Sequence, residues 1–230
     1  YIDRAEKNKQ RSDELLAGSK ENFIWLKKFQ TKNHYPYAYR DLKKAHKNLI
    51  SSIVNGDFDR VKRVLPQLLK EQKALEILSA QRFYLQDISK RTRRDGRQEL
   101  SKYAALSYNT SLGALNNARA VIAHNPRDEK NILKAKKDAE FSFGVAHAVA
   151  DDMQKLTKMN HHEMERWLIL LTAKLHDTGA ALGSVDMRDL PLLEQFKLIA
   201  NAAIDNKNMS QAPESNSYDI RPISAAPATE

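Results

Sequence analysis

The chain has 230 residues, of which 41% are hydrophobic and 29% are charged, enough for one domain or two small ones with a buried core. Seven Gly and seven Pro are too few for the many turns of a β-sandwich or barrel, which argues against an all-β fold. The lack of Cys excludes disulfides, thiol catalysis and Cys-ligated zinc. No apolar run approaches the ~18 residues that a membrane-spanning helix needs.

Hydrophobic residues recur with helical spacing along most of the chain. We therefore predict an all-α fold, an irregular antiparallel bundle of six or seven helices. A short first helix carries the apolar cluster between Phe23 and Phe29. The next helix covers about residues 38–54 and stops at Asn55-Gly56-Asp57, where Gly56 supplies a left-handed residue and Asp57 caps the helix that follows.

A long helix follows this turn. Its apolar seam runs from Phe58 to Leu85 in steps of three, four or seven residues. Pro66 lies within this seam. Because proline lacks the backbone N–H and clashes with the preceding turn, we predict a kink or a break near residues 62–66.

Helix caps and hydrophobic periodicity predict where the helices of the second half of the chain begin and end. A helix is expected over residues 104–122, followed by Asn125 as the N-cap and Pro126 as the first residue of a helix that reaches about residue 159. Asn160 is followed three residues later by Glu163, the spacing of a capping box.

The helix that begins after Asn160 contains the apolar run Trp167–Leu171, which predicts a central, mostly buried helix. A last helix is expected over about residues 191–206.

We expect two helical lobes, residues 1–125 and 126–206, and a flexible tail over residues 207–230 that is rich in Ser, Asn, Ala and Pro. Three apolar residues of the tail are candidate anchors for a partner groove: Tyr218, Ile220 and Ile223.

Positive charge is concentrated in the first two thirds of the chain. Residues 1–150 hold 30 Lys and Arg against 17 Asp and Glu, whereas residues 151–230 hold 8 against 12. A basic surface of this kind attracts anionic partners.

The densest cluster of basic residues surrounds Asp95-Gly96 and predicts an exposed turn that binds carboxylates or phosphates. It consists of Lys90, Arg91, Arg93, Arg94 and Arg97. No interleaved aromatic residues or known nucleic-acid-binding motif accompany it, so sequence-specific nucleic-acid recognition is not supported.

A second candidate site lies in the C-terminal half. An apolar helix ends in the adjacent pair His176-Asp177 just before Gly179, and His147 stands 29 residues upstream of His176. This pattern resembles the metal-binding signature of the HD-domain phosphohydrolases over about residues 143–205, with Asp205 in the place of that family's later Asp. The resemblance implies a divalent cation that activates water for phosphate-ester hydrolysis. The alternative is structural: His176 stands at a helix C-terminus, where an imidazolium favours the last carbonyls.

These features favour binding over catalysis. We expect a non-catalytic helical adaptor or structural subunit of a larger protein assembly, which binds acidic partner surfaces through its basic N-terminal lobe and uses no cofactor or metal. The first alternative is an HD-like metal-dependent phosphohydrolase that uses His147, His176 and Asp177. The second is a module that binds nucleic acid or an anionic membrane by charge alone. We expect a soluble, cytoplasmic protein.

Overall fold

The computed structural model describes residues 2–95 and 99–210, and all regular secondary structure among them is helical. The predicted all-α fold is thereby confirmed. The chain divides into two compact units, of which unit 1 ends at Thr157 and unit 2 begins at Lys158. Within the described ranges, no helix combines the length and the hydropathy that a membrane crossing requires.

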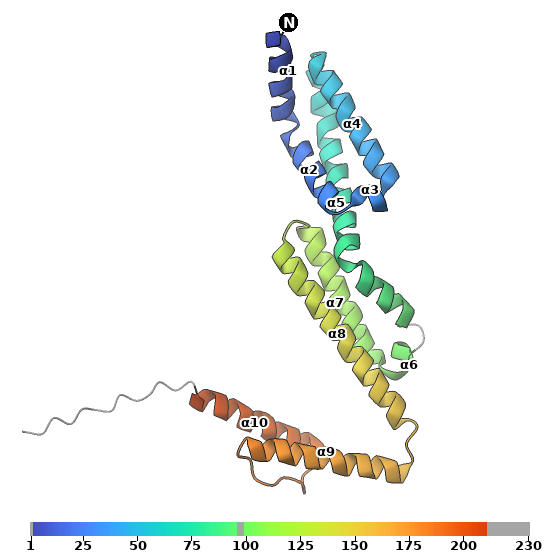
Figure 1. The fold of residues 1–230 in the computed structure, drawn as a ribbon, viewed down its shortest axis with the longest axis vertical. Helices are drawn as coiled ribbons and strands as arrows, with labels where there is room; N and C mark the ends of the chain where they lie inside the picture. The colour runs from blue at the N-terminus through green and yellow to red at the C-terminus, as the bar shows by residue number, and fades with distance from the viewer. Residues whose placement is uncertain (1, 96–98, 211–230) are drawn as a thin grey trace, which may run out of the picture. The chain divides into compact units, whose positions relative to one another are not determined.

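In the first half of unit 1, helices α2 and α4 pack against the N-terminal half of α5, and α1 packs against α4 and α2 (Figure 1). The elements, in chain order, are α1 (Ile2–Leu15), α2 (Ala17–Lys28), α3 (Thr31–His34), α4 (Pro36–Val54) and α5 (Phe58–Asp95). The turn between α4 and α5 forms as predicted. Gly56 takes a φ of 79°, and Asp57 Oδ1 accepts a hydrogen bond from the Arg60 N–H at 3.1 Å. The core of this half includes Leu16, Leu26, Leu49, Ile53 and Leu68.

Helix α5 continues without interruption through Pro66, so the break expected near residues 62–66 does not occur. Pro66 and Lys62 are both exposed. The Lys62 carbonyl, which would receive the hydrogen bond that Pro66 cannot donate, is therefore on the solvent side of the helix, where water can replace the missing donor. The change of direction that Figure 1 shows in α5 lies in its green C-terminal part.

The second half of unit 1 is a helical hairpin that packs on the C-terminal half of α5 (Figure 1). Its elements are α6 (Ser101–Tyr103), α7 (Ala105–His124) and α8 (Glu129–Leu156). The boundary expected at residue 125 lies inside unit 1, at the turn of the α7–α8 hairpin. The core of this half includes Leu85, Ile88, Leu115, Ile122, Ile132 and Ala139.

The prediction that Asn125 is the N-cap of α8 is wrong. The cap is Asp128, whose side chain accepts from the Asn131 N–H at 3.2 Å. Asn125 Oδ1 instead accepts from the Arg127 N–H at 3.1 Å, which makes a tight turn between α7 and α8. This turn delays the start of α8 by about three residues and directs the Arg127 side chain toward α5.

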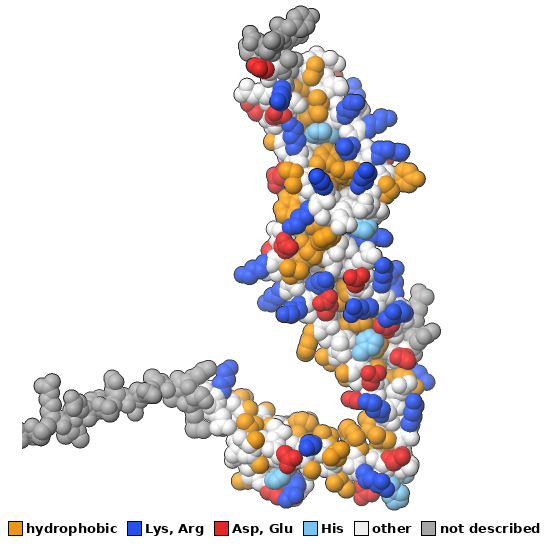
Figure 2. Space-filling view, in the orientation of Figure 1, with side chains coloured by type: hydrophobic (Ala, Val, Ile, Leu, Met, Phe, Trp, Pro, Cys, Tyr) orange, Lys and Arg blue, Asp and Glu red, His pale blue; other side chains and the backbone are white. Residues whose placement is uncertain are grey.

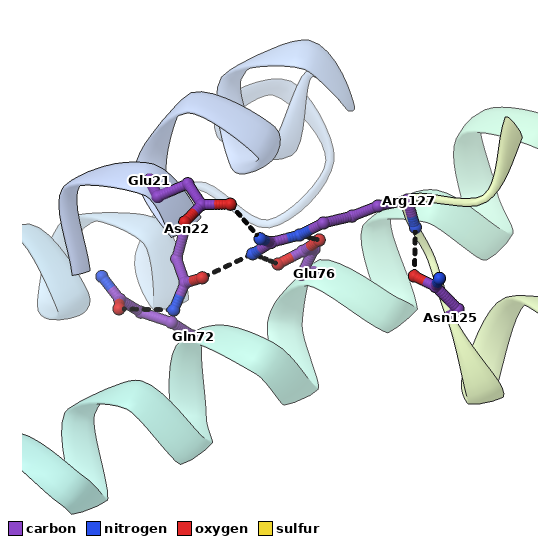
Figure 3. A network of polar contacts seen from close by, with 6 residues as sticks. All are labelled: Glu21, Asn22, Gln72, Glu76, Asn125 and Arg127. Carbon is purple, nitrogen blue, oxygen red and sulfur yellow. Dashed lines mark hydrogen bonds and ion pairs between the residues drawn. The ribbon is translucent and has the colours of Figure 1, made fainter. Parts of the chain in front are cut away.

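Arg127 joins three parts of unit 1 that are far apart in sequence (Figure 3). Its Nε donates to Glu76 Oε1 at 2.7 Å and its Nη2 donates to Glu76 Oε2 at 2.9 Å, a bidentate pair between the α7–α8 turn and α5. Nη1 donates to Glu21 Oε1 at 2.6 Å and Nη2 donates to Asn22 Oδ1 at 2.5 Å, both on α2. The Glu76 side chain is 1% exposed, so Arg127 neutralises a buried carboxylate.

The substitution Arg127→Met is expected to lower the free energy of unfolding by about 3 kcal/mol, because it leaves the buried Glu76 carboxylate without a partner. Chemical denaturation followed by circular dichroism measures this loss. Arg40→Met is the matched control, since the Arg40–Asp41 pair is exposed on both sides and contributes about 0.5 kcal/mol at most. The double variant Glu76→Gln, Arg127→Met removes the buried charge and should recover part of the loss. Equal stability of Arg127→Met and Arg40→Met would contradict this account.

Unit 2 contains α9 (His161–Ala181) and α10 (Leu192–Ser210). The predicted capping box at the start of α9 is confirmed, because Asn160 Oδ1 accepts from the Glu163 N–H at 3.0 Å and Glu163 Oε2 accepts from the Asn160 N–H at 2.8 Å. The α10 residue Ile199 lies close to Gly179, and Asn206 Nδ2 donates to the Leu182 carbonyl at 3.0 Å.

The expected burial of Trp167–Leu171 is wrong. Ile169 is 62% and Leu170 is 59% exposed. Only Leu175 and Gly179 of α9 are buried, because α10 covers a single face of that helix. The apolar run therefore forms surface, not core.

Candidate functional site

The clearest candidate site in unit 1 is a shallow groove of about 430 Å³ along α5. Its charged lining residues are all basic. The polar and charged side chains that line it are Tyr35, Gln81, Arg82, Gln86, Ser89, Lys90, Arg93 and Arg119. We call this feature the basic groove.

Helical spacing explains why α5 presents cations here. Arg82, Gln86 and Arg93 follow one another at four and seven residues, so at about 100° per residue they share one face of the helix. At the same 100° per residue, the acidic residues Asp87 and Asp95 lie about 140° around the helix from Arg82. The α5 face toward the groove is consequently free of carboxylates.

The opposite wall comes from α7. The Gln81 side chain donates from Nε2 to the Arg119 carbonyl at 3.4 Å, which ties α7 to α5 beside the groove. The Arg119 guanidinium is oriented by its own helix, since Nη1 donates to Asn116 Oδ1 at 3.0 Å. Arg93 is held in a similar way, with Nε donating to the Ser89 carbonyl at 3.2 Å. Two guanidinium groups thus stand in defined positions on two helices.

The carboxylates of the described residues do not neutralise the groove cations. In the described part of the chain, no carboxylate pairs with Arg82, Lys90, Arg93 or Arg119. All four are exposed and retain N–H donors for an external acceptor. An arrangement of this kind can bind carboxylates or phosphates, with the Arg forks adding bidentate geometry to the attraction.

The structure separates the basic residues that the sequence grouped together. Lys90 and Arg93 line the groove, whereas Arg91 lies about 180° around α5 from Arg82. Arg94 pairs with Asp95, with Nε donating to Oδ1 at 2.6 Å. Arg94 and His147 together hold the pKa of the Asp95 carboxyl below its usual range. Four other predicted partner-binding residues lie outside the described residues: Arg97, Tyr218, Ile220 and Ile223.

Two further cations line the groove that were not predicted from the sequence, Arg82 and Arg119. The signal for Arg82 was available, because its spacing to Gln86, Lys90 and Arg93 marks one helical face. Arg119 carries no such signal, since only the packing of α7 on α5 brings it to the groove.

Three residues of the HD-like pattern each contact a carboxylate or a cation of their own unit, namely His147, His176 and Asp177. In unit 1, His147 Nε2 lies 3.3 Å from Asp95 Oδ2. In unit 2, His176 Nδ1 lies 3.4 Å from Asp186 Oδ1, and Asp177 Oδ2 lies 3.7 Å from Lys174 Nζ. Asp205 is exposed on α10. Over residues 2–95 and 99–210, no three His, Asp or Glu side chains are grouped closely enough to hold a metal ion.

A Ser–His pair lies between α2 and α4 in the first half of unit 1, with Ser19 buried and His46 half-buried. Ser19 Oγ and His46 Nδ1 are 2.9 Å apart, and Gln72 Nε2 donates to Ser19 Oγ at 2.9 Å. This is the geometry of a nucleophile and its base. Ser19 is 0% exposed, however, so a substrate cannot reach its hydroxyl. The pair therefore joins α2, α4 and α5 as part of the core. Burial, together with the nearby Lys20 charge, lowers the pKa of His46.

The His46 environment makes the stability of the protein pH-dependent. Because the pKa of His46 is lower in the folded than in the unfolded chain, the unfolded chain binds more protons at mildly acidic pH. The free energy of unfolding should therefore decrease as the pH falls from about 7.5 through the ordinary His value of ~6.5. Denaturant titrations between pH 7.5 and 5.5 measure this slope. It should flatten in His46→Gln and persist in the control His162→Gln, whose ring is exposed. An unchanged slope in His46→Gln would contradict the assignment.

Comparison with protein-family profiles, with characterised proteins and with solved structures finds no match to this chain.

Proposed function

We propose that this chain is a helical interaction subunit that holds an acidic segment of a partner protein in the basic groove of unit 1. The observation that carries the proposal is the convergence of four uncompensated cations on one groove. Two of them, Arg93 and Arg119, come from different helices and are oriented by hydrogen bonds to their own helices. Such fixed donors lose less conformational freedom on binding than free side chains.

The dimensions of the groove support an extended anionic ligand. Arg82 and Arg93 are eleven residues apart on α5, which corresponds to about 16 Å along the helix axis. A single phosphate or carboxylate cannot reach both residues, whereas several acidic side chains of one peptide segment can. Each exposed contact contributes roughly 0.2–1 kcal/mol. Four contacts together therefore contribute on the order of 1–4 kcal/mol, a modest and salt-sensitive gain that suits reversible association.

The amide and hydroxyl side chains between the cations also support a protein ligand. Gln81, Gln86 and Ser89 offer both donors and acceptors. A peptide backbone needs both kinds of partner, whereas a phosphate backbone uses donors alone. Tyr35 is the single aromatic residue in the lining, too few for the stacked platform on which single-stranded nucleic acid binds.

The triple variant Arg82→Glu, Lys90→Glu, Arg93→Glu is expected to weaken binding of a fluorescent poly-glutamate peptide at least tenfold, as measured by fluorescence anisotropy at low salt. The loss follows because three attractive contacts become repulsive. The matched control is Lys43→Glu, Lys44→Glu, Lys47→Glu on α4. It changes the net charge by the same amount at three exposed positions outside the groove and should change the affinity less than threefold.

Two results would overturn the proposal. Equal losses in the two triple variants would mean that total charge, not the groove, determines binding. Tighter binding of a DNA or RNA oligomer of the same length and charge than of the peptide, with the same dependence on the groove residues, would assign the groove to nucleic acid.

A further inference from the structure

Unit 2 buries very little of its hydrophobic side chains. The three clusters of buried core residues found among the described residues all belong to unit 1. In the described part of unit 2, residues 158–210, the buried hydrophobic side chains are Leu175 and Met187. A helix of a water-soluble protein normally packs its apolar stripe against another element, and here that stripe is largely uncovered.

Many large apolar side chains of unit 2 are instead on its surface, between 37% and 79% exposed. Figure 2 shows hydrophobic side chains along both α9 and α10. We call this feature the α9–α10 apolar surface. Its members are Met164, Trp167, Leu168, Ile169, Leu170, Val185, Leu193, Phe196, Leu198 and Ile204. At roughly half of the ~200 Å² that a large free side chain exposes, they offer on the order of 1,000 Å² per chain. At about 100° per residue these side chains point in several directions around α9 and α10, so a single partner can cover only part of this area.

Helix α10 contributes an ordered seam to this surface. Leu193, Phe196, Ala200 and Ile204 follow one another at three, four and four residues and are all exposed. This spacing places them on one face of the helix, as in the seams of paired helices. Ile199, which lies beside Gly179 of α9, is on another face. Helix α10 therefore has one apolar face toward α9 and a second one that is open.

The charge of unit 2 favours a second copy of the chain over an anionic membrane as the partner of this surface. Residues 158–210 hold 6 Lys and Arg against 7 Asp and Glu. A helix that lies on an anionic membrane needs a polar face rich in Lys and Arg, which this balance does not provide. Two copies of a nearly neutral unit do not repel each other. Residues 1–157, by contrast, hold 31 basic against 19 acidic residues, so copies of unit 1 do repel each other.

We propose that the α9–α10 apolar surface binds a second copy of this chain, with the α10 seams of the two copies packed against each other about Ala200. In a two-fold dimer the same residues face each other across the axis, and Ala200 lies at the middle of the seam. The small side chain of Ala200 lets the two helices approach closely there. Such a dimer contains two copies of the basic unit 1, one from each chain.

Sedimentation equilibrium of the full chain at about 50 µM tests the proposal. The expected mass is twice the 26.3 kDa of one chain. The variant Phe196→Glu, Ile204→Glu should sediment as a monomer, because it places charges in the apolar seam. The matched control is Leu106→Glu, Phe141→Glu, which adds the same charges at exposed apolar positions of unit 1 and should leave the dimer intact. A monomeric parent chain, or a dimer that resists the seam variant, would overturn the proposal.

Cross-linking gives an independent test that does not depend on a disruptive variant. The chain contains no Cys, so a single introduced Cys can form a disulfide only with a second copy. Under mild oxidation Ala200→Cys should become a covalent dimer, because residues near the two-fold axis come within disulfide distance. Asn201→Cys, about 100° around the helix, should cross-link several-fold less. Equal yields from the two positions would show random collision and would refute the seam.

Discussion

The contact between Arg127 and Glu76 fixes the arrangement of unit 1. Glu76 is a carboxylate in the interior of a long helix, and the guanidinium that neutralises it comes from the α7–α8 turn. Because an unpaired buried carboxylate is costly, the turn is held at this point of α5. Arg119 lies eight residues earlier on α7, so the same contact sets where Arg119 stands relative to α5. The basic groove depends in this way on an ion pair that is not part of its lining.

The sequence predicted local structure well where a short-range signal decided it. The turn at Gly56 and the capping box at Asn160 involve residues no more than four apart, and both form as expected. The N-cap of α8 was misassigned because a tertiary contact, from Arg127 to Glu76, favours a tight turn at Asn125. The uninterrupted course of α5 through Pro66 likewise depends on solvent exposure, which the residue type alone does not reveal.

Two of the four cations that line the basic groove were predicted from the sequence. Lys90 and Arg93 were found from charge density, and Arg82 could have been found from helical spacing. Charge density alone also selected Arg91 and Arg94, because it ignores the face of the helix on which each residue lies. Arg119 required knowledge of the packing between α5 and α7. The same limitation explains Trp167–Leu171, since hydrophobicity indicates that a segment prefers burial but not which partner covers it.

If the proposed function is right, anionic ligands bind at the basic groove and not at the basic surface in general. Backbone NMR of the isotope-labelled full chain, titrated with an acidic peptide, tests it most directly because each amide reports its own location. We expect the largest changes in chemical shift at Gln81–Arg93 of α5 and around Arg119 of α7, and little change on α4. Comparable changes at Lys43, Lys44 and Lys47 would contradict it.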